Sequence, residues 1–216
     1  MVDLLTFILL SISSIFIVVN PLAAMLIYVT LTDTMDVKTR LSVAYEANRV
    51  ALIVILAFAL AGGAILQIFG ISLEAFRVAG GILLFGIGME MVYAKTSRTK
   101  MTATEKYEGI DADDIAMMPL AVPMIAGPGT ITTVIVLMNE AVDIGIEAMA
   151  AIILLCPIVI MVNYYSMKNA DLITKHIGSR EYRVIGRLMG MILIAIAVQF
   201  VITGLRQAFP VLVGGL

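Results

Sequence analysis

The chain has 216 residues, of which 61% are hydrophobic and only 14% are charged, and its formal net charge is −2. Soluble domains hold about 45–50% apolar and about 25% charged residues, so this composition excludes an ordinary soluble enzyme. The near-neutral charge offers no basic face to nucleic acid, and a single cysteine with a single histidine excludes an internal disulfide and clustered zinc or redox sites. We therefore expect no catalytic residues, no metal and no cofactor.

Stretches without Asp, Glu, Lys or Arg mark the predicted membrane spans, because about 20 apolar residues cross the hydrocarbon core as a helix. Five such stretches are Leu4–Thr32, Val50–Leu73, Ile115–Asn139, Ala148–Met167 and Leu188–Leu205. A sixth, Ser72–Tyr93, is equally apolar but carries Glu74 and Arg77 near one end and Glu90 near the other. The sequence thus predicts an all-α polytopic membrane protein with six transmembrane helices in the lipid bilayer.

The first span is expected to stay in the membrane, because the chain begins Met-Val-Asp without a basic start and the apolar run is too long for a signal peptide. Basic residues favour the cytoplasmic side of a membrane. Twelve of the 14 lie in the first, third and fifth connections: Lys38, Arg40, Arg49, Lys95, Arg98, Lys100, Lys106, Lys168, Lys175, Arg180, Arg183 and Arg187. Both termini are therefore predicted to lie outside the plasma membrane.

The two halves of the chain resemble each other. Asn20-Pro21 interrupts the first span and Gly127-Pro128-Gly129 interrupts the fourth, and the two prolines are 107 residues apart. Residues 77–83 are similar to residues 187–193 at a spacing of 110, while a rival register at 106 matches Arg77 with Arg183. Either register leaves three helices per half, so the second copy is inverted. We predict a first repeat over 1–94, a cytoplasmic connection over 95–114 and an inverted repeat over 115–216.

Both interruptions fall near the middle of their spans. Proline removes an amide donor and glycine permits unusual backbone angles, and backbone groups freed at this depth must be buried in protein or line a wet cavity. The amides that open the following half-helix attract a carboxylate. A single proline kink, as at Pro157, is ordinary in a membrane helix, but two at matched depth favour a substrate site. The predicted substrate-binding residues are Asn20, Pro21, Leu22, Gly127, Pro128, Gly129, Thr130 and Thr133.

A small zwitterion fits this arrangement, since its ammonium can meet free carbonyls at the end of the preceding half-helix. Thr132 and Thr133 follow the second interruption, and their hydroxyls either meet a ligand or bond their own preceding carbonyls. Asn163 in the fifth span and Gln199 in the sixth are costly there unless paired, so each is either a contact between helices or part of a pathway.

Charged neighbours at two helix ends can form ion pairs. Glu46 and Arg49 flank Asn48 at the start of the second span and are i,i+3 neighbours, which indicates either an ordinary interfacial pair or a gate. Glu74 and Arg77 repeat that spacing at the start of the third span. No carboxylate falls at the membrane midplane, so the sequence assigns no residue to a coupling proton or cation.

The sequence resembles the MarC family of six-helix membrane proteins over almost its whole length. The resemblance is carried by Asn20-Pro21, Ala79–Phe85, Met89–Met91, Pro119–Thr130, Ala195–Phe200 and Gly204. It implies two interlocked halves with discontinuous first and fourth helices, and uptake of glycine- or alanine-like amino acids driven by an ion or proton gradient. Many members carry a further proline and an aromatic residue where this chain has Leu26 and Tyr28, so the half-helix after Asn20 is expected to be more regular here.

The leading hypothesis is therefore a secondary transporter of small neutral amino acids that works by alternating access. The alternative is an exporter or channel for another small solute, which the same interruptions permit. A membrane enzyme is disfavoured, because the apolar spans hold no Ser/His pair, phosphate motif or metal cluster.

Overall fold

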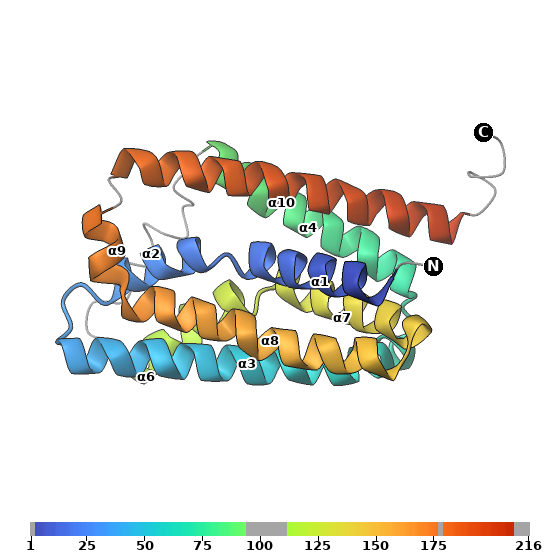
Figure 1. The fold of residues 1–216 in the computed structure, drawn as a ribbon, viewed down its shortest axis with the longest axis horizontal. Coiled ribbons are helices and arrows are strands. Elements are labelled where there is room, and N and C mark those ends of the chain that lie inside the picture. The colour runs from blue at the N-terminus through green and yellow to red at the C-terminus, as the bar shows by residue number, and fades with distance from the viewer. Residues whose placement is uncertain (1–2, 94–111, 177–178, 210–216) are drawn as a thin grey trace.

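The computed structural model describes residues 3–93, 112–176 and 179–209, and every regular element in them is helical (Figure 1). In chain order these are α1 (Leu4–Val19), α2 (Pro21–Leu31), α3 (Val37–Ile68), α4 (Leu73–Tyr93), α6 (Ala112–Ile115), the irregular turns of η1 (Ala116–Ile125), α7 (Pro128–Ile144), α8 (Ile146–Lys168), α9 (Ala170–His176) and α10 (Ser179–Ala208). Lys95, Arg98, Lys100 and Lys106, with most of the predicted 95–114 connection, lie outside the described residues.

Five helical stretches in the described residues are long and apolar enough to cross a bilayer: Leu4–Leu31, Val37–Ile68, Leu73–Tyr93, Ile146–Lys168 and Val184–Ala208. The pair Ala112–Ile125 and Pro128–Ile144 makes a sixth crossing if it is counted as one span, although it bends by 53°. The prediction of an all-helical, multi-pass membrane protein is confirmed. Several helices extend beyond the uncharged runs, because Lys, Arg and Glu are good helix formers whose long side chains reach the headgroup region.

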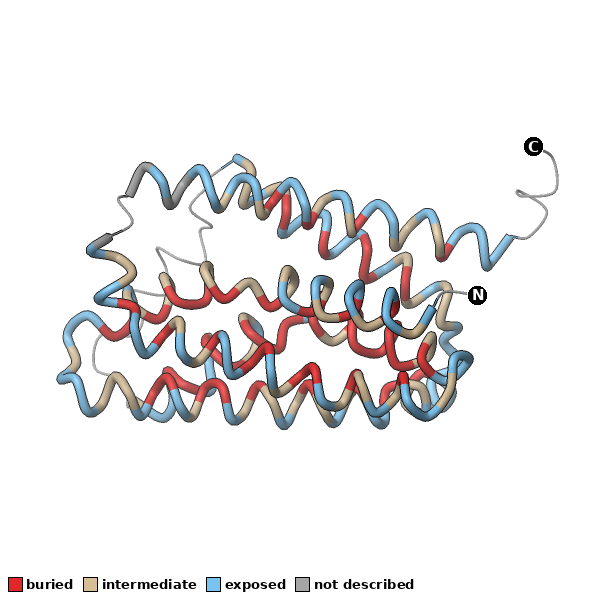
Figure 2. Tube along the Cα trace, in the orientation of Figure 1, coloured by how far each residue is buried: buried red, intermediate tan, exposed pale blue. Residues whose placement is uncertain are grey.

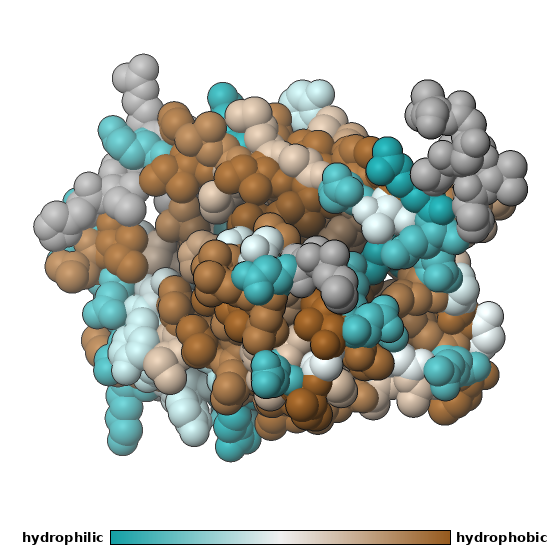
Figure 3. All heavy atoms as spheres, turned by 45° about the vertical axis from the view of Figure 1, so that its right-hand side comes forward, coloured by the Kyte–Doolittle hydropathy of each residue, from teal (hydrophilic) through white to brown (hydrophobic). Residues whose placement is uncertain are grey.

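Large apolar side chains face outward along the spanning helices. Leu5, Ile53, Ile82 and Leu154 are 60–64% exposed. Apolar residues also cover most of the face shown in Figure 3. Water would solvate such a surface poorly, whereas lipid chains match it.

The buried residues, whose positions along the chain Figure 2 shows, form two separate clusters. The larger cluster lies among α1, α2, α3, η1, α7 and α8, which we call the bundle. The smaller consists of Leu84 from α4 with Leu193 and Ala197 from α10. These two helices pack closely on each other, and we call them the α4–α10 pair.

Glycines set the close approach inside the α4–α10 pair. A Cβ added to Gly88 would lie 3.0 Å from the carbonyl oxygen of Gly190, and one added to Gly190 would lie 2.9 Å from that of Gly88. Gly81 meets the carbonyl oxygen of Ala197 in the same way, at 2.8 Å. Small residues at a helix interface let backbones come together where lipid supplies no hydrophobic driving force.

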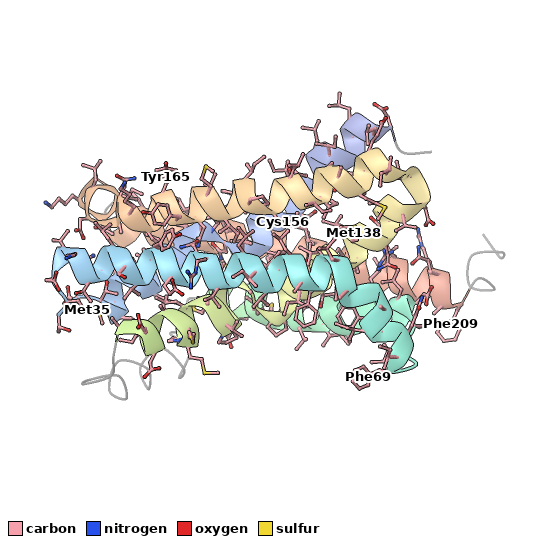
Figure 4. The ribbon with its side chains drawn as sticks, turned by 90° about the horizontal axis from the view of Figure 1, so that it is seen from below. Met35, Phe69, Met138, Cys156, Tyr165 and Phe209 are labelled. Atoms are coloured by element: carbon pink, nitrogen blue, oxygen red, sulfur yellow. The ribbon has the colours of Figure 1, made fainter. Side chains whose placement is uncertain are left out.

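The long helices run between two opposite ends of the molecule (Figure 1). α1 begins and α10 ends at the same end (Figure 1), where Phe69 and Phe209 also lie (Figure 4), and we call it the terminal face. Met35 and Tyr165 lie at the opposite end (Figure 4), which we call the loop face because the α2–α3 and α8–α9 turns are there.

Candidate functional site

Asn20 separates α1 from α2 with a single residue. It adopts left-handed backbone angles, φ 50° and ψ 68°, which asparagine tolerates better than most residues. Its amide donates to the carbonyl of Phe16 at 3.0 Å and ends α1, while its side-chain oxygen accepts from the amide of Ala23 at 3.3 Å and caps α2. Pro21 then takes the first helical position, where no amide is needed. Asn20 thus satisfies one backbone group at each helix end, so the start of α2 has fewer amides free for a ligand than the sequence predicts.

The half-helix after Asn20 is regular, as the sequence predicts. α2 runs without interruption from Pro21 to Leu31, with Pro21 buried and Leu22 half-buried. α1 and α2 together form one spanning stretch, unlike the bent pair in the second half. The two interruptions therefore differ in geometry.

The second interruption is prepared by two prolines in η1. A residue before proline is pushed out of helical angles, and Met118 (φ −132°, ψ 124°) and Val122 (φ −131°, ψ 125°) are extended for that reason. Pro119 and Pro123 follow them and have no amide to donate. The irregular backbone contacts α3 and α2 on one side, which buries Leu120, Ala121 and Ile125, while Met118 and Pro123 are exposed.

α7 begins without a side-chain cap. Gly127 occupies the N-cap position, and its carbonyl accepts from the amide of Ile131 at 2.9 Å. Among the described residues, the amides of Gly129 and Thr130 have no acceptor, and both residues are buried, while Pro128 is exposed. A buried helix start with free amides and a partial positive charge is suited to hold a carboxylate.

The start of α7 lies beside the end of α1 and beneath α4. A Cβ added to Gly129 would overlap the side chain of Leu84 and lie 3.4 Å from Cγ1 of Val18. The side-chain amide of Asn20 donates to the sulfur of Met91 at 3.2 Å. Leu84 and Met91 share one face of α4 and are seven residues, or about 10 Å, apart along it. The structure therefore brings the two interruptions together against α4, whose Leu84 fills the space in front of Gly129.

The threonines after the second interruption have different partners. Thr130 donates to the carbonyl of Ile125 at 2.9 Å, and Thr132 donates to that of Pro128 at 2.8 Å. The hydroxyl of Thr133 is fully buried with no partner among the described residues. Thr133 lies four residues after Gly129 and therefore on the same face of α7. The sequence left two interpretations open for the hydroxyls of Thr132 and Thr133. Thr132 bonds a carbonyl of its own helix, whereas Thr133 has no partner among the described residues.

A second unpaired hydroxyl belongs to α1 and was missed by the sequence reasoning. Ser11 is fully buried, and its hydroxyl has no partner among the described residues. It lies two turns before Val18 on the same face of α1, the face that meets α7. A serine in an apolar helix commonly bonds its own preceding carbonyl, so the sequence carries no signal for this one.

The remaining polar residues of the spans lie elsewhere. Asn163 is fully buried and donates to the side-chain oxygen of Asn48 at 2.8 Å, which joins α8 to α3. Asn48 in turn donates to the carbonyl of Ala44 at 2.7 Å and to the sulfur of Met167 at 3.2 Å. This is a contact between helices inside the bundle, away from the two interruptions.

Arg49 and Gln199 are exposed, and Glu46, which pairs with Arg49, is partly exposed. Arg49 donates to Glu46 at 2.6 Å, with the arginine side chain 56% exposed. Gln199 is exposed and donates to Thr203 of its own helix at 3.1 Å. In the structure these three residues do not approach the interruptions.

The prediction that Arg77 pairs with Glu74 is wrong. Arg77 is 2% exposed and donates through Nη2 to Glu140 of α7 at 2.7 Å and through Nη1 to Gln207 of α10 at 3.0 Å, while its Nε has no acceptor among the described residues. The face of α4 that carries Arg77 also carries Gly80 and Leu84 and points to α7, so the carboxylate it meets comes from another helix.

A second network ties the loop face together. Arg40 of α3 donates to Asp171 of α9 at 3.0 Å and to the hydroxyl of Thr32 at 3.2 Å. Asp36 caps α3, and hydrogen bonds from the hydroxyl and amide of Thr39 and the amide of Lys38 hold the pKa of its carboxyl below the usual value. Both devices fix the α2–α3 turn, at a distance from the interruptions.

An apolar groove of about 310 Å³ runs between α1 and α8, lined by Ile12, Phe16, Ile158 and Val162 among others. It opens on the apolar outer surface. Among the described residues, no three His, Cys, Asp or Glu side chains gather closely enough to hold a metal ion.

Comparison with known proteins places the chain among integral membrane proteins. The family described as MarC family integral membrane protein matches residues 5–209. The UPF0056 membrane protein MJ1677 of Methanocaldococcus jannaschii is 42% identical over 94% of this chain and 98% of its own length. UPF0056 membrane protein YvbG of Bacillus subtilis is 36% identical over 92% and 94%, and YhcE of Escherichia coli is 31% identical over 90% of each chain. No solved structure matches the chain.

Proposed function

We propose that this chain, which belongs to the MarC family of integral membrane proteins, is a secondary transporter of small neutral amino acids of the glycine or alanine class. Transport proceeds by alternating access and is coupled to an ion or proton gradient. The observation that carries the proposal is the uncapped, buried start of α7, with the unpaired hydroxyl of Thr133 one turn further along the same helix face.

The substrate carboxylate is placed at the amides of Gly129 and Thr130, and the hydroxyl of Thr133 supplies a further donor. The ammonium is placed at carbonyls in the last turn of α1, beside Val18. No charged side chain is needed, because backbone dipoles of opposite sign serve the two ends of a net-neutral substrate. The first interruption contributes less than the sequence predicts, since Asn20 caps its own half-helix.

Alternating access is supported by the position of Leu84. This side chain occupies the space that a ligand at Gly129 needs, so a substrate reaches the amides only when α4 moves away from α7. The two halves are proposed to be inverted repeats with discontinuous first and fourth helices. The interruptions at Asn20 and at Gly127 support this, because each falls in the first span of its half.

The orientation is proposed from charge. Lys38, Arg40, Lys168 and Arg187 belong to the loop face, whereas Arg206 and several carboxylates belong to the terminal face. The loop face is therefore proposed to be cytoplasmic, with both termini outside the plasma membrane.

The test is counterflow of labelled glycine in proteoliposomes, with and without a pH gradient. Thr133→Val is expected to weaken glycine uptake about tenfold, because it removes one donor from a buried polar site. Thr132→Val is the matched control, since the Thr132 hydroxyl already bonds the carbonyl of Pro128. Equal effects of the two variants would argue against the assigned site, and non-saturating solute flux in the wild type would favour a channel over a carrier.

A further inference from the structure

The ion pair of Arg77 closes the terminal face by joining the α4–α10 pair to the bundle. Arg77 belongs to α4, Glu140 to α7 and Gln207 to α10, so three helices meet at one guanidinium. The arginine is 2% exposed while the Glu140 side chain is 44% exposed, which places the pair at the outer rim of the contact between α4 and α7.

The same face of α4 continues the contact inward. Gly80 is pressed against Thr132, and Leu84 covers Gly129, so the stripe Arg77, Gly80, Leu84 follows α7 from its end toward its start. The ion pair is thus the outermost element of a seal above the candidate substrate site.

The loop face lacks the equivalent seal. With the two prolines aligned at 107 residues, Glu140 is equivalent to Asp33, and with the register of 110, Arg77 is equivalent to Arg187. The counterpart of the contact between α4 and α7 is a contact between α10 and α2. Among the described residues, α2 packs on α8, η1 and α9 rather than on α10, Asp33 and Arg187 are both exposed, and neither forms an ion pair.

We propose that Arg77–Glu140 and Asp33–Arg187 are two ion-pair gates that form alternately, the first closed and the second open in this structure. The inference rests on the proposed inverted repeat and deepens it, because it assigns the residues that hold each end shut. Opening the terminal face breaks the pair at Arg77, and the α4–α10 pair then swings so that the start of α10 reaches the end of α2. Because the two halves carry opposite charges at equivalent positions, each of the two states is stabilised by its own ion pair.

The closed gate is tested by labelling, which needs no substrate. Cys156 is buried inside the bundle (Figure 4), so Cys156→Ser gives a background without cysteine. Val136→Cys is the reporter, because Val136 is 1% exposed and lies between Thr132 and Glu140 on the face of α7 that meets α4. We expect Glu140→Gln to speed its labelling by a water-soluble maleimide about tenfold, the effect of losing one charge-assisted contact on a two-state equilibrium.

Asp143→Asn is the matched control, since Asp143 is an exposed acid on the same helix that forms no ion pair among the described residues. Arg77→Gln should raise labelling as Glu140→Gln does, and the half-exposed position of Glu140 keeps the test independent of whether the buried arginine is needed for folding. Labelling rates unchanged by Glu140→Gln, or raised equally by Asp143→Asn, would overturn the terminal gate. Absence of glycine counterflow would defeat the proposed function and leave this result standing.

The open gate is tested by cross-linking. Asp33→Cys with Arg187→Cys should form little disulfide while Glu140 is intact, and about tenfold more once Glu140→Gln releases the terminal face. Asp33→Cys with Arg183→Cys is the comparison, because the register of 106 would place Arg183 there instead. Cross-linking that ignores Glu140→Gln, or that prefers position 183, would overturn the assignment of Asp33–Arg187.

Discussion

Replacing Gly80 with alanine should drive α4 away from α7. The added Cβ would overlap Cγ2 of Thr132 and lie 2.7 Å from both its Cβ and its Oγ1. Thr132 yields poorly, because it is β-branched, 2% exposed and bonded to the carbonyl of Pro128. Overpacking of this kind costs about 1–3 kcal/mol, and the stiff neighbour places Gly80→Ala at the upper end. Alanine recovers about 1 kcal/mol of helix propensity, so the free energy of unfolding should fall by about 2 kcal/mol.

Gly86 on the same helix is the matched control, since an added Cβ there meets nothing within 4 Å. Gly86→Ala should therefore raise the free energy of unfolding by up to about 1 kcal/mol. The measurement is unfolding of both variants in mixed micelles with increasing dodecyl sulfate. Adding Thr132→Ser to Gly80→Ala removes the overlapping methyl and should recover part of the loss. If Gly80→Ala and Gly86→Ala change stability alike, the close packing of α4 on α7 is refuted.

Two further predictions concern polar groups away from the candidate site. A double-mutant cycle of Asn48→Leu and Asn163→Leu in micelles should give a coupling of about 0.6–1.7 kcal/mol, as for other hydrogen bonds between membrane helices, and additive effects would contradict the bond. The lowered pKa of Asp36 means that its stabilising contribution is complete above the ordinary value of 3.8 and is lost as pH falls through the folded-state pKa. Between pH 5 and pH 3 the thermal midpoint of the wild type should therefore fall further than that of Asp36→Asn, and parallel curves would disprove the cap.

The membrane spans were predictable because a bilayer demands long uncharged runs whatever the tertiary structure. The positions of the interruptions were also predictable, since proline and glycine act on the backbone locally. The backbone groups that each interruption leaves free for a ligand were less predictable. Asn20 was expected to leave free amides, yet asparagine is itself a good N-cap, and its side chain satisfies Ala23.

Partners brought together by tertiary packing could not be read from the chain. Arg77 has an acidic neighbour at i−3, which is the only partner that local spacing proposes, but the rotation of α4 about its axis directs the guanidinium to Glu140. The rotational phase of α7 likewise determines the surroundings of Thr132, which bonds its own helix, and of Thr133, whose hydroxyl is unpaired among the described residues. Sequence periodicity in an all-apolar helix does not fix that phase, because lipid-facing and protein-facing positions are equally hydrophobic.

The division of the core indicates which part of the molecule moves. The bundle shares one large cluster that runs through α1, α3, α7 and α8, and the Asn48–Asn163 hydrogen bond joins two of its helices further. The α4–α10 pair has a small cluster of its own, and it meets the bundle mainly along one stripe of α4, with a smaller contact between α10 and α1. Shearing that stripe exposes far less apolar surface than separating helices of the bundle, so its free-energy cost is lower. Because the stripe covers both interruptions, the motion that costs least is also the one that uncovers the proposed substrate site.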